Sequence, residues 1–249
     1  MRKTKEIAMG FLFITIIGFI GYSVFQYNKK RTNRELARRI AEISPRGGPP
    51  ETIEGLRQAI ALYEAQIERN VREGAQTGVY WKILAIRLAD RGMHNDALDA
   101  LERAIYYNSE DPALFYSAGI SAGIAAKSIV GFSPNAVSER EHYYRLSENA
   151  YLRAFELDNA YTKPLYGLGV LYVFELNRPA EAIPHLERSL SIQGSDINTM
   201  FVLARAYAMT GSYSQAIELY ERIISRSRDR QIQAEALNNI DTIQRLIYE

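Results

Sequence analysis

The sequence of 249 residues has no cysteine and only three histidines. The absence of cysteine excludes disulfide bonds, thiol nucleophiles, iron–sulfur clusters and cysteine-ligated zinc. His94 is expected in a surface turn, and His142 and His185 have no second histidine or paired carboxylate at metal-ligand spacing. A P-loop, G-x-G-x-x-G and H-E-x-x-H are also absent. We therefore expect no metal, no cofactor and no small-molecule substrate.

Net charge is also small, at +1, but it is unevenly distributed. Residues 1–50 contain ten Lys and Arg against three acidic residues, whereas residues 51–249 contain twenty against twenty-six. A mildly acidic main part does not suit a phosphate backbone, so the charges argue against nucleic-acid binding. The chain is 47% hydrophobic and 24% charged, which is typical of a folded protein rather than a disordered one.

Residues 1–28 are predicted to form a short basic tail and a transmembrane anchor helix. The run from Ile7 to Tyr27 is 21 residues without a charge, or about 31 Å as a helix, which matches the hydrocarbon thickness of a bilayer. A cleaved signal peptide is the alternative, because Gly21 and Ser23 form a small-x-small pattern. The apolar run continues past Ser23, which favours an uncleaved anchor.

The charges that flank this span give two opposing indications of its orientation. More Lys and Arg residues follow the span than precede it, which would place the C-terminal side inside the cell. A short basic tail is itself costly to move across a membrane, however, and long domains translocate largely regardless of charge. We favour an arrangement in which the main domain lies outside the cytoplasm, in the manner of a signal anchor.

Residues 29–50 are expected to form a basic juxtamembrane segment and a linker. Leu36, Ile40 and Ile43 have helical spacing, and such a helix is suited to an anionic membrane surface. A solvated spacer is an equally good interpretation. The Pro- and Gly-rich stretch from Ser44 to Pro50 then ends any helix, so the main domain is expected to span residues 51–249.

A pattern of large and small residues recurs along the main domain. Each copy has a large residue, a second one three positions later, a small residue next, and another large residue three further on. The copies are Trp81, Leu84, Ala85 and Leu88; Leu165, Leu168, Gly169 and Tyr172; and Met200, Leu203, Ala204 and Tyr207. A second helix follows each, opening around Ala97, Ala182 or Ala216.

This pattern resembles the tetratricopeptide repeat, a 34-residue helix pair. The resemblance implies an all-α fold, an α-solenoid in which helix pairs form a right-handed superhelix. Repeats are expected near 78–111, 112–161, 162–196 and 197–230, between capping helices at 52–72 and 231–248. The second repeat is expected to begin at Pro112, with Asp111 as its cap, and an extra stretch of about sixteen residues separates its helices. Ser133 and Pro134 are expected to cap and open a long second helix. The third is one residue too long and has Pro184 inside its second helix, where a kink is expected.

Residues 119–123 match the G-x-S-x-G pattern of hydrolases. That motif requires a strand-to-helix turn, and here it falls within a predicted repeat helix in a chain without strand patterns. We therefore interpret Ser121 as a packing residue and expect no enzyme activity.

The resemblance also implies where a partner binds, since relatives bind ligands in a concave groove lined by the first helix of each repeat. By this resemblance, eleven residues of the chain are expected in that groove: Lys82, Ile86, Asp90, Tyr116, Ile120, Tyr166, Val170, Phe174, Phe201, Arg205 and Met209. These residue types suit a protein or peptide partner. Some relatives clamp a C-terminal carboxylate with Lys and Asn, but only Lys82 fits that arrangement. An alternative is that the groove is covered by the chain's own insertion or by its N-terminal helix; the apolar residues of the insertion are Ile124, Ile129, Val130 and Phe132.

The function expected from these observations is a membrane-anchored scaffold that binds protein partners and supports assembly of a membrane or envelope complex. One rival is a structural protein that forms homo-oligomers through the insertion and the C-terminal helix. A helical envelope hydrolase is a second rival.

Overall fold

The computed structural model describes residues 34–35, 38, 52–131 and 133–248, and all the regular structure in them is helical. The chain divides into two compact units, residues 1–73 and 74–249, which are described separately. The anchor predicted at 1–28 and nearly all of the segment 29–50 lie outside the described residues. Within the part of the chain that is described, no helix combines the length and apolar character needed to cross a membrane.

Helix α2 runs without interruption from Ile53 to Ala89. This corrects the predicted break between a capping helix at 52–72 and a first repeat helix beginning near 78. The intervening sequence has no proline, and its glycines remain helical. A Cβ atom at Gly78 would lie 2.8 Å from Cβ of Tyr107, so this glycine permits close helix packing and does not end the helix.

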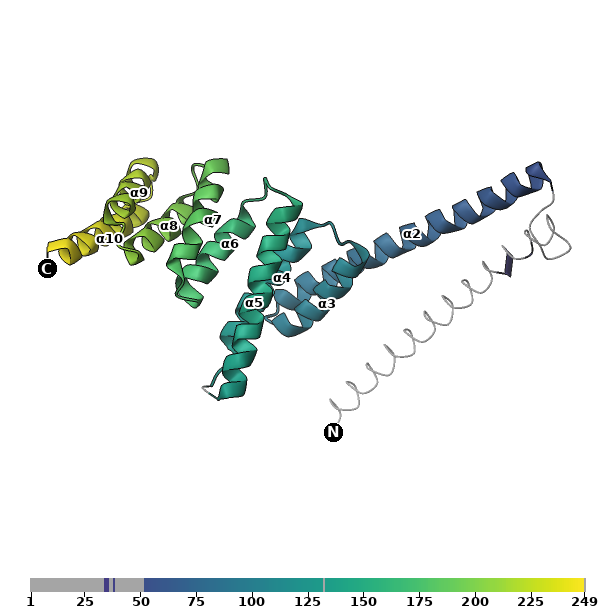
Figure 1. Cartoon of the computed structure of the whole chain (residues 1–249), viewed down its shortest axis with the longest axis horizontal. Helices are drawn as coiled ribbons and strands as arrows, with labels where there is room; N and C mark the ends of the chain where they lie inside the picture. Colours follow the sequence, from purple (N-terminus) through teal and green to yellow (C-terminus); the bar gives the residue numbers. More distant parts are fainter. Residues whose placement is uncertain (1–33, 36–37, 39–51, 132, 249) are drawn as a thin grey trace, which may run out of the picture. The chain divides into compact units, whose positions relative to one another are not determined.

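The remaining helices follow one another in antiparallel pairs along the unit 74–249 (Figure 1). They are α3 (His94–Tyr107), α4 (Pro112–Ser128), α5 (Pro134–Leu157), α6 (Lys163–Val170), α7 (Pro179–Ile192), α8 (Ile197–Met209), α9 (Tyr213–Arg226) and α10 (Arg230–Tyr248). A π-helical turn, η1 (Leu171–Glu175), continues α6. Each helix packs mainly on its neighbours in sequence, which is the arrangement of a solenoid.

Side-chain caps fix where three of these helices begin. Asp111, Ser133 and Asp196 each accept a hydrogen bond from a backbone N–H in the first turn, of α4, α5 and α8 respectively. Pro112 and Pro134 follow two of these caps at the first helical position, where proline costs no hydrogen bond. The predicted caps and proline starts of α4 and α5 are confirmed.

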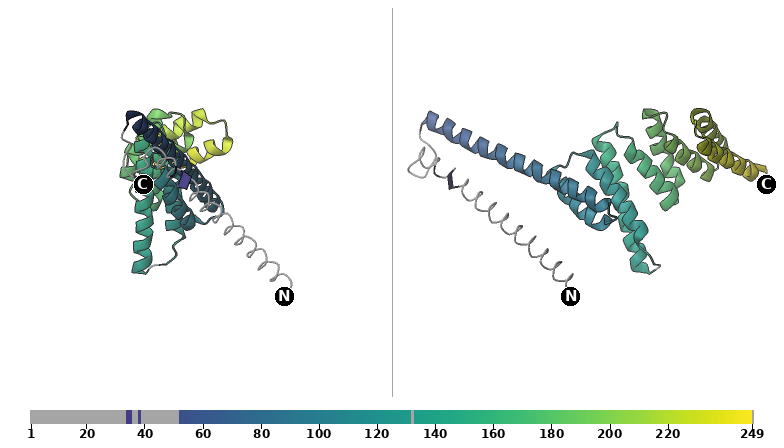
Figure 2. Two further views of the ribbon diagram at one scale, coloured as in Figure 1. Left: turned by 90° about the vertical axis from the view of Figure 1, so that its right-hand side faces the viewer. Right: turned by 180° about the vertical axis from the view of Figure 1, so that it is seen from behind.

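The insertion in the second repeat lengthens both of its helices. Helix α4 has 17 residues and α5 has 24, whereas α8 and α9 have 13 and 14. The pair therefore extends beyond the neighbouring helices (Figure 2). Arg140 Nη2 closes its far end by donating hydrogen bonds to the carbonyls of Ile129 (2.9 Å) and Gly131 (3.1 Å). The long second helix that opens at Ser133 and Pro134 is confirmed, whereas the expected separate stretch is corrected, because the extra residues also lengthen α4.

The third repeat accommodates its extra residue in η1. In the first and fourth repeats, a backbone hydrogen bond that closes the first helix spans five residues, from Met93 N to Leu88 O (3.0 Å) and from Ser212 N to Tyr207 O (2.8 Å). The corresponding bond in the third repeat spans six, from Arg178 N to Tyr172 O (2.8 Å). The π-turn therefore takes up one residue and leaves the start of the next helix in register.

A residue with positive φ follows the first helix in each of these three repeats. Gly92 and Gly211 have φ of 76° and 78°, and Asn177 has φ of 50°. Glycine adopts this conformation without a steric penalty, and asparagine tolerates it better than other residues. The three positions are thus structurally equivalent helix ends.

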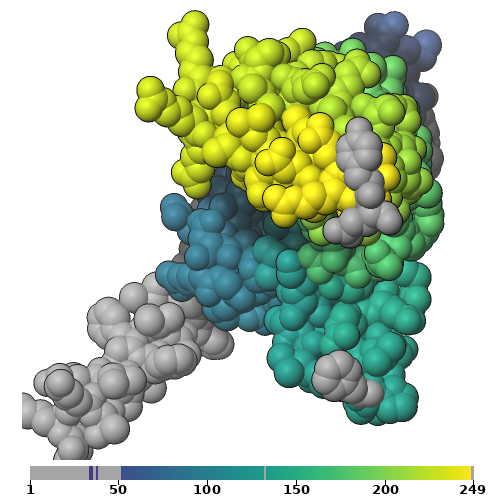
Figure 3. Space-filling view, turned by 90° about the vertical axis from the view of Figure 1, so that its left-hand side faces the viewer, coloured from purple at the N-terminus to yellow at the C-terminus, as the bar shows by residue number. Residues whose placement is uncertain are grey.

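Small residues lie at the closest helix contacts, as the repeat pattern predicts. Ala85 and Ala204 are fully buried, and a Cβ at Gly169 would lie 2.3 Å from Cδ2 of Leu186 in α7. Trp81 packs beside Ala85 in the core of the first repeat. At the other end, α10 buries Ile240 and Ile243 against the main core cluster, and Figure 3 looks onto this end, where α9 and α10 face the viewer.

Candidate partner-binding groove

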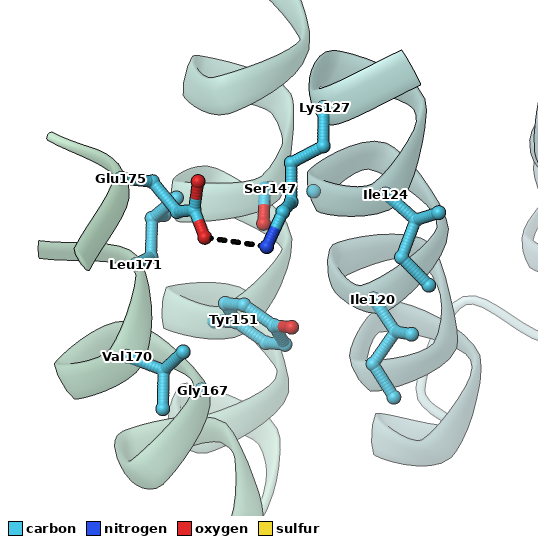
Figure 4. A pocket seen from close by; sticks show the side chains of 10 residues that line it. Ile120, Ile124, Lys127, Ser147, Tyr151, Gly167, Val170, Leu171 and Glu175 are labelled. Atoms are coloured by element: carbon cyan, nitrogen blue, oxygen red, sulfur yellow. Dashed lines mark hydrogen bonds and ion pairs between the residues drawn. The ribbon is translucent and has the colours of Figure 1, made fainter. Parts of the chain in front are cut away.

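A pocket of about 170 Å³ lies between the first helices of the second and third repeats. Helix α4 forms one wall, α6 and η1 form the opposite wall, and α5 lies behind them (Figure 4). Its lining is Ile120, Gly123, Ile124, Lys127, Ser147, Tyr151, Gly167, Val170, Leu171 and Glu175. Most of this lining is apolar. The volume is well below the roughly 300–1,000 Å³ of small-molecule sites, and it suits one side chain of a larger partner.

The ring of Tyr151 forms the floor of the pocket and lies in a slot between two glycines. A Cβ at Gly119 would lie 2.5 Å from Cε1 of Tyr151, and a Cβ at Gly167 would lie 2.7 Å from its Cζ. Burial raises the pKa of the Tyr151 hydroxyl, which therefore stays protonated. One turn away on α5, Ser147 Oγ donates a buried hydrogen bond of 2.7 Å to the carbonyl of Gly119. The floor is thus closely packed and hydrogen-bonded within the chain itself.

One end of the pocket is charged. Lys127 Nζ lies 2.8 Å from Glu175 Oε1 across the opening (Figure 4). The hydroxyl of Tyr144 donates a hydrogen bond of 3.1 Å to the other oxygen of Glu175. Burial and the Glu175 carboxylate raise the pKa of Tyr144 to about 12. The pocket therefore offers an apolar interior beside an anchored carboxylate and a lysine that is 58% exposed.

Two of the eleven predicted groove residues, Ile120 and Val170, line this pocket from opposite walls. Tyr116 is half-buried beside its floor, with ring centroids 5.9 Å from Tyr151 and 5.4 Å from Tyr161. Burial raises the pKa of Tyr116, and also that of Tyr166. These tyrosines serve as packing residues with one edge exposed.

The predicted residues of the third and fourth repeats include one exposed pair. Phe174 is 50% exposed, and the guanidinium of Arg205 lies 5.4 Å from its ring centroid, which is cation–π geometry. Phe201 is half-buried and packs on Tyr220, with ring centroids 5.8 Å apart, while Met209 is exposed. Phe174 and Arg205 therefore offer a partner an aromatic face with a cation above it.

The predicted residues of the first repeat do not line the pocket. Lys82 Nζ lies 2.6 Å from Asp111 Oδ2, the capping side chain of α4, so its charge is already paired within the chain. Ile86 is exposed, and Asp90 is exposed just beyond the end of α2. This pairing adds to the argument against a clamp for a C-terminal carboxylate.

Sequence reasoning missed Ile124, Lys127, Tyr151 and Glu175 as pocket residues. The sequence predicts Ile124 as part of an insertion that covers the groove, yet its side chain is 40% exposed and lines the pocket wall. Val130, at the end of the insertion, is 92% exposed, so it does not cover the groove either. The one available signal was the extra residue of the third repeat, because the π-turn that absorbs it includes Glu175.

The G-x-S-x-G motif lies within helix α4, and Ser121 is buried there. It is therefore not on the strand-to-helix turn that a hydrolase requires. Among the described residues, no group of three His, Asp or Glu side chains is placed to hold a metal ion.

A polar cluster surrounds Tyr172 in the third repeat. Its hydroxyl donates a hydrogen bond of 2.5 Å to Glu148, and the ring of His185 stacks on it at 5.8 Å. The Arg178 guanidinium lies 5.0 Å from the same ring and 3.9 Å from Glu148. Burial lowers the pKa of His185, opposed in part by Glu148 and Glu181, so its neutral form is favoured.

The family model of the tetratricopeptide repeat matches residues 165–229. This segment of the chain is therefore similar to tetratricopeptide repeats. The matched segment comprises α6 to α9, the two repeats whose first helices contribute Val170, Phe174 and Arg205. The second repeat, which supplies the other wall of the pocket, lies outside the match.

Known proteins resemble the chain over most of its length. A TPR repeat-containing protein of Borreliella burgdorferi is 22% identical over 233 residues, which is 93% of this chain and 98% of the relative. A crystal structure of MamA superposes with a TM-score of 0.51 at 17% identity, covering 74% of this chain and 90% of MamA. The structure of MamA from residue 41 onward, of Desulfovibrio magneticus RS-1, superposes with a TM-score of 0.52 at 16% identity. It covers 68% of this chain and 96% of that MamA chain. At these identities the likeness to MamA is one of fold.

Proposed function

We propose that this tetratricopeptide-repeat protein is a scaffold that binds a protein or peptide partner in the groove between α4 and η1. The observation that supports this function best is the pocket between two neighbouring repeats, with an apolar interior and a charged rim. Its size suits one apolar side chain. Phe174 and Arg205 add an exposed aromatic and cation pair, and aromatic and arginine residues are the types that dominate binding energy at protein interfaces.

We further propose that residues 1–28 anchor this scaffold in a membrane, with the repeats outside the cytoplasm. The uncharged run from Ile7 to Tyr27 supports the anchor. Such an anchor would raise the effective concentration of the groove near membrane proteins, which suits a role in assembling a membrane or envelope complex. Fractionation of cells that express the full chain, followed by protease treatment before and after permeabilisation, tests both statements. Recovery from the soluble fraction would contradict the anchor. Digestion of the repeats only after permeabilisation would contradict their place outside the cytoplasm.

The binding function is tested by affinity capture with the full chain carrying Ile120→Asp or Phe174→Ala. Both side chains are at least one-third exposed, so their replacement should leave the fold intact. We expect each change to weaken binding of the captured partner at least tenfold, as for interface hot spots. Tyr166 and Phe201 are less useful here because both pack against the main core.

Leu237→Ala is the matched control, since Leu237 is 51% exposed on α10, outside the groove. Partners that bind in the groove are retained by this control and lost from both groove variants. Equal retention by all three variants would place recognition elsewhere and refute the proposal.

A further inference from the structure

Helix α2 carries a row of exposed apolar side chains in its N-terminal half. They are Ile53, Leu56, Ile60, Tyr63, Ile67 and Val71, and their exposures range from 41% to 73%. From Ile53 to Ile67 the spacing alternates between three and four residues, which places these side chains along one face of a helix. Such a face usually marks an interface.

In the C-terminal half of α2, the same apolar face is covered by helix α3. There Gly78, Trp81 and Ala85 continue the row and pack on α3. Tyr107, which contacts Gly78, is the last residue of α3. The covered half thus pairs with another helix, and the exposed half has the geometry to do the same.

The alternating spacing of three and four residues is the a and d pattern of a two-helix coiled coil. With Ile53, Ile60 and Ile67 at a positions, Leu56 and Tyr63 occupy d positions. Arg57 and Glu64 then both fall at e positions on one flank of the row. Charges at the flanking positions set the orientation of the partner helix.

We propose that α2 pairs with α2 of a second copy of this chain, as an antiparallel coiled coil centred between Ala61 and Leu62. Ile60 then faces Tyr63 of the partner subunit, and Leu56 faces Ile67 of the partner subunit. Antiparallel helices bring e positions together, so Arg57 meets Glu64 of the partner subunit twice across the twofold axis. A parallel pair would place Glu64 opposite Ala59, with no opposite charges aligned.

The absence of cysteine makes this arrangement testable by disulfide cross-linking in the full chain. We expect the double variant Leu56→Cys/Ile67→Cys to form a covalent dimer under mild oxidation in membranes. The two positions are about 16 Å apart along one helix, so they cannot join within a chain. Each single variant should remain monomeric, because Leu56 and its copy lie equally far apart in the antiparallel pair.

Gln58→Cys/Ala65→Cys is the matched control. Like residues 56 and 67, Gln58 and Ala65 are equally far from the proposed centre between Ala61 and Leu62. They lie on the opposite face of α2, and both are exposed. We expect the control to form at least tenfold less covalent dimer than Leu56→Cys/Ile67→Cys. Equal cross-linking of the control would mean that collisions, rather than a specific interface, produce the dimer, and would overturn the proposal.

A charge exchange provides a second, independent measurement. Arg57→Glu alone, or Glu64→Arg alone, should weaken dimerisation of the detergent-solubilised chain by about tenfold, because two ion pairs are lost per dimer. The double variant Arg57→Glu/Glu64→Arg restores both pairs and should restore the dimer in light scattering.

A monomer in light scattering with no cross-link would overturn the inference, and efficient cross-linking of the single variants would overturn the antiparallel orientation. The proposed partner binding does not depend on either result. Phe174→Ala should leave the cross-link unchanged.

Discussion

Single glycine residues set how closely the helices of this array approach one another. Gly169 contacts the fully buried Leu186, and Gly119 and Gly167 hold the ring of Tyr151 between them. A side chain at any of these positions would collide with atoms that have little room to move. The glycines therefore fix both the packing of the repeats and the floor of the pocket.

Gly169→Ala should lower the free energy of unfolding by about 1–3 kcal/mol, as overpacking of a core does. The added Cβ would lie 2.3 Å from Leu186 Cδ2, and that side chain is fully buried. Gly123→Ala is the control, because its Cβ would lie at an ordinary 3.4 Å from Ser147 Oγ. There we expect a gain of about 0.5–1 kcal/mol from the helix preference of alanine. Urea denaturation measures both, and equal effects would contradict this account.

His185 should make the stability depend on pH. Burial lowers its pKa from the ordinary 6.5, so the unfolded chain binds a proton at a higher pH than the folded chain does. The contribution of neutral His185 to the free energy of unfolding is fully present above about pH 6.5, and it is lost as the pH falls through the pKa of the folded chain. We expect the urea midpoint of the natural chain to fall more between pH 7 and pH 5 than that of His185→Gln. A parallel fall in both would assign the acid sensitivity to other groups.

The repeat pattern predicted the small residues at helix contacts but not the slot around Tyr151. Gly169 and Ala204 occupy a fixed place in the pattern, so their contacts follow from local spacing. The slot combines Gly119, Tyr151 and Gly167, which lie in three different helices. Gly119 and Tyr151 hold the same places in the second repeat as Gly169 and Leu186 hold in the third. Gly167 belongs to the next repeat, so its contact with Tyr151 does not follow from spacing within one repeat.

At the scale of single elements, η1 gives the third repeat its particular chemistry. The extra residue was countable in the sequence, but a count does not distinguish a longer loop from a π-turn. The structure places it in the last turn of the first helix, where Glu175 meets Lys127 and Tyr144. π-Helical turns are rare and often accompany functional sites.

Deletion of Phe174 should convert η1 into an α-helical turn like those of the first and fourth repeats. Glu175 would then leave the Tyr144 hydroxyl, and the pKa of Tyr144 should fall from about 12 towards its ordinary value of 10. NMR of isotope-labelled tyrosine measures this titration. Phe174→Ala keeps the turn and should leave the pKa of Tyr144 unchanged. A Tyr144 pKa near 12 in the deletion variant would show that the turn does not position Glu175.

Helix boundaries were predicted well where caps mark them and poorly where they do not. Asp111 and Ser133 are recognisable caps, and α4 and α5 begin directly after them. Between residues 72 and 78 no proline is present, and the two helices expected from a repeat that starts at 78 are the single helix α2. The proline expected to kink α7, Pro184, lies inside a helix that continues to Ile192.

At the scale of the repeat unit, stability is expected to depend on contacts between neighbours. Such arrays need an end that covers the last apolar face. Helix α10 fills this role in the unit 74–249, because Ala236, Ile240 and Ile243 are buried against the same core as Leu219 and Ile223 of α9.

Truncation of the chain after Asp229 should therefore lower the free energy of unfolding by about 3–6 kcal/mol. Ile240 and Ile243 alone account for this loss, because burial of each side chain contributes about 1.5–3 kcal/mol. The loss should be local to that end of the array. Hydrogen exchange should accelerate strongly in α9 and remain nearly unchanged in α3. Uniform acceleration along the chain would show that the repeats unfold as one cooperative unit.

The chain has one tryptophan, Trp81, and it packs in the core of the first repeat. Its fluorescence therefore reports on that end of the array, whereas far-ultraviolet circular dichroism averages over every helix. If the repeats melt in sequence, the two optical signals separate in denaturant, and if they melt together the signals coincide. The native chain thus contains its own positional probe of cooperativity, without any added label.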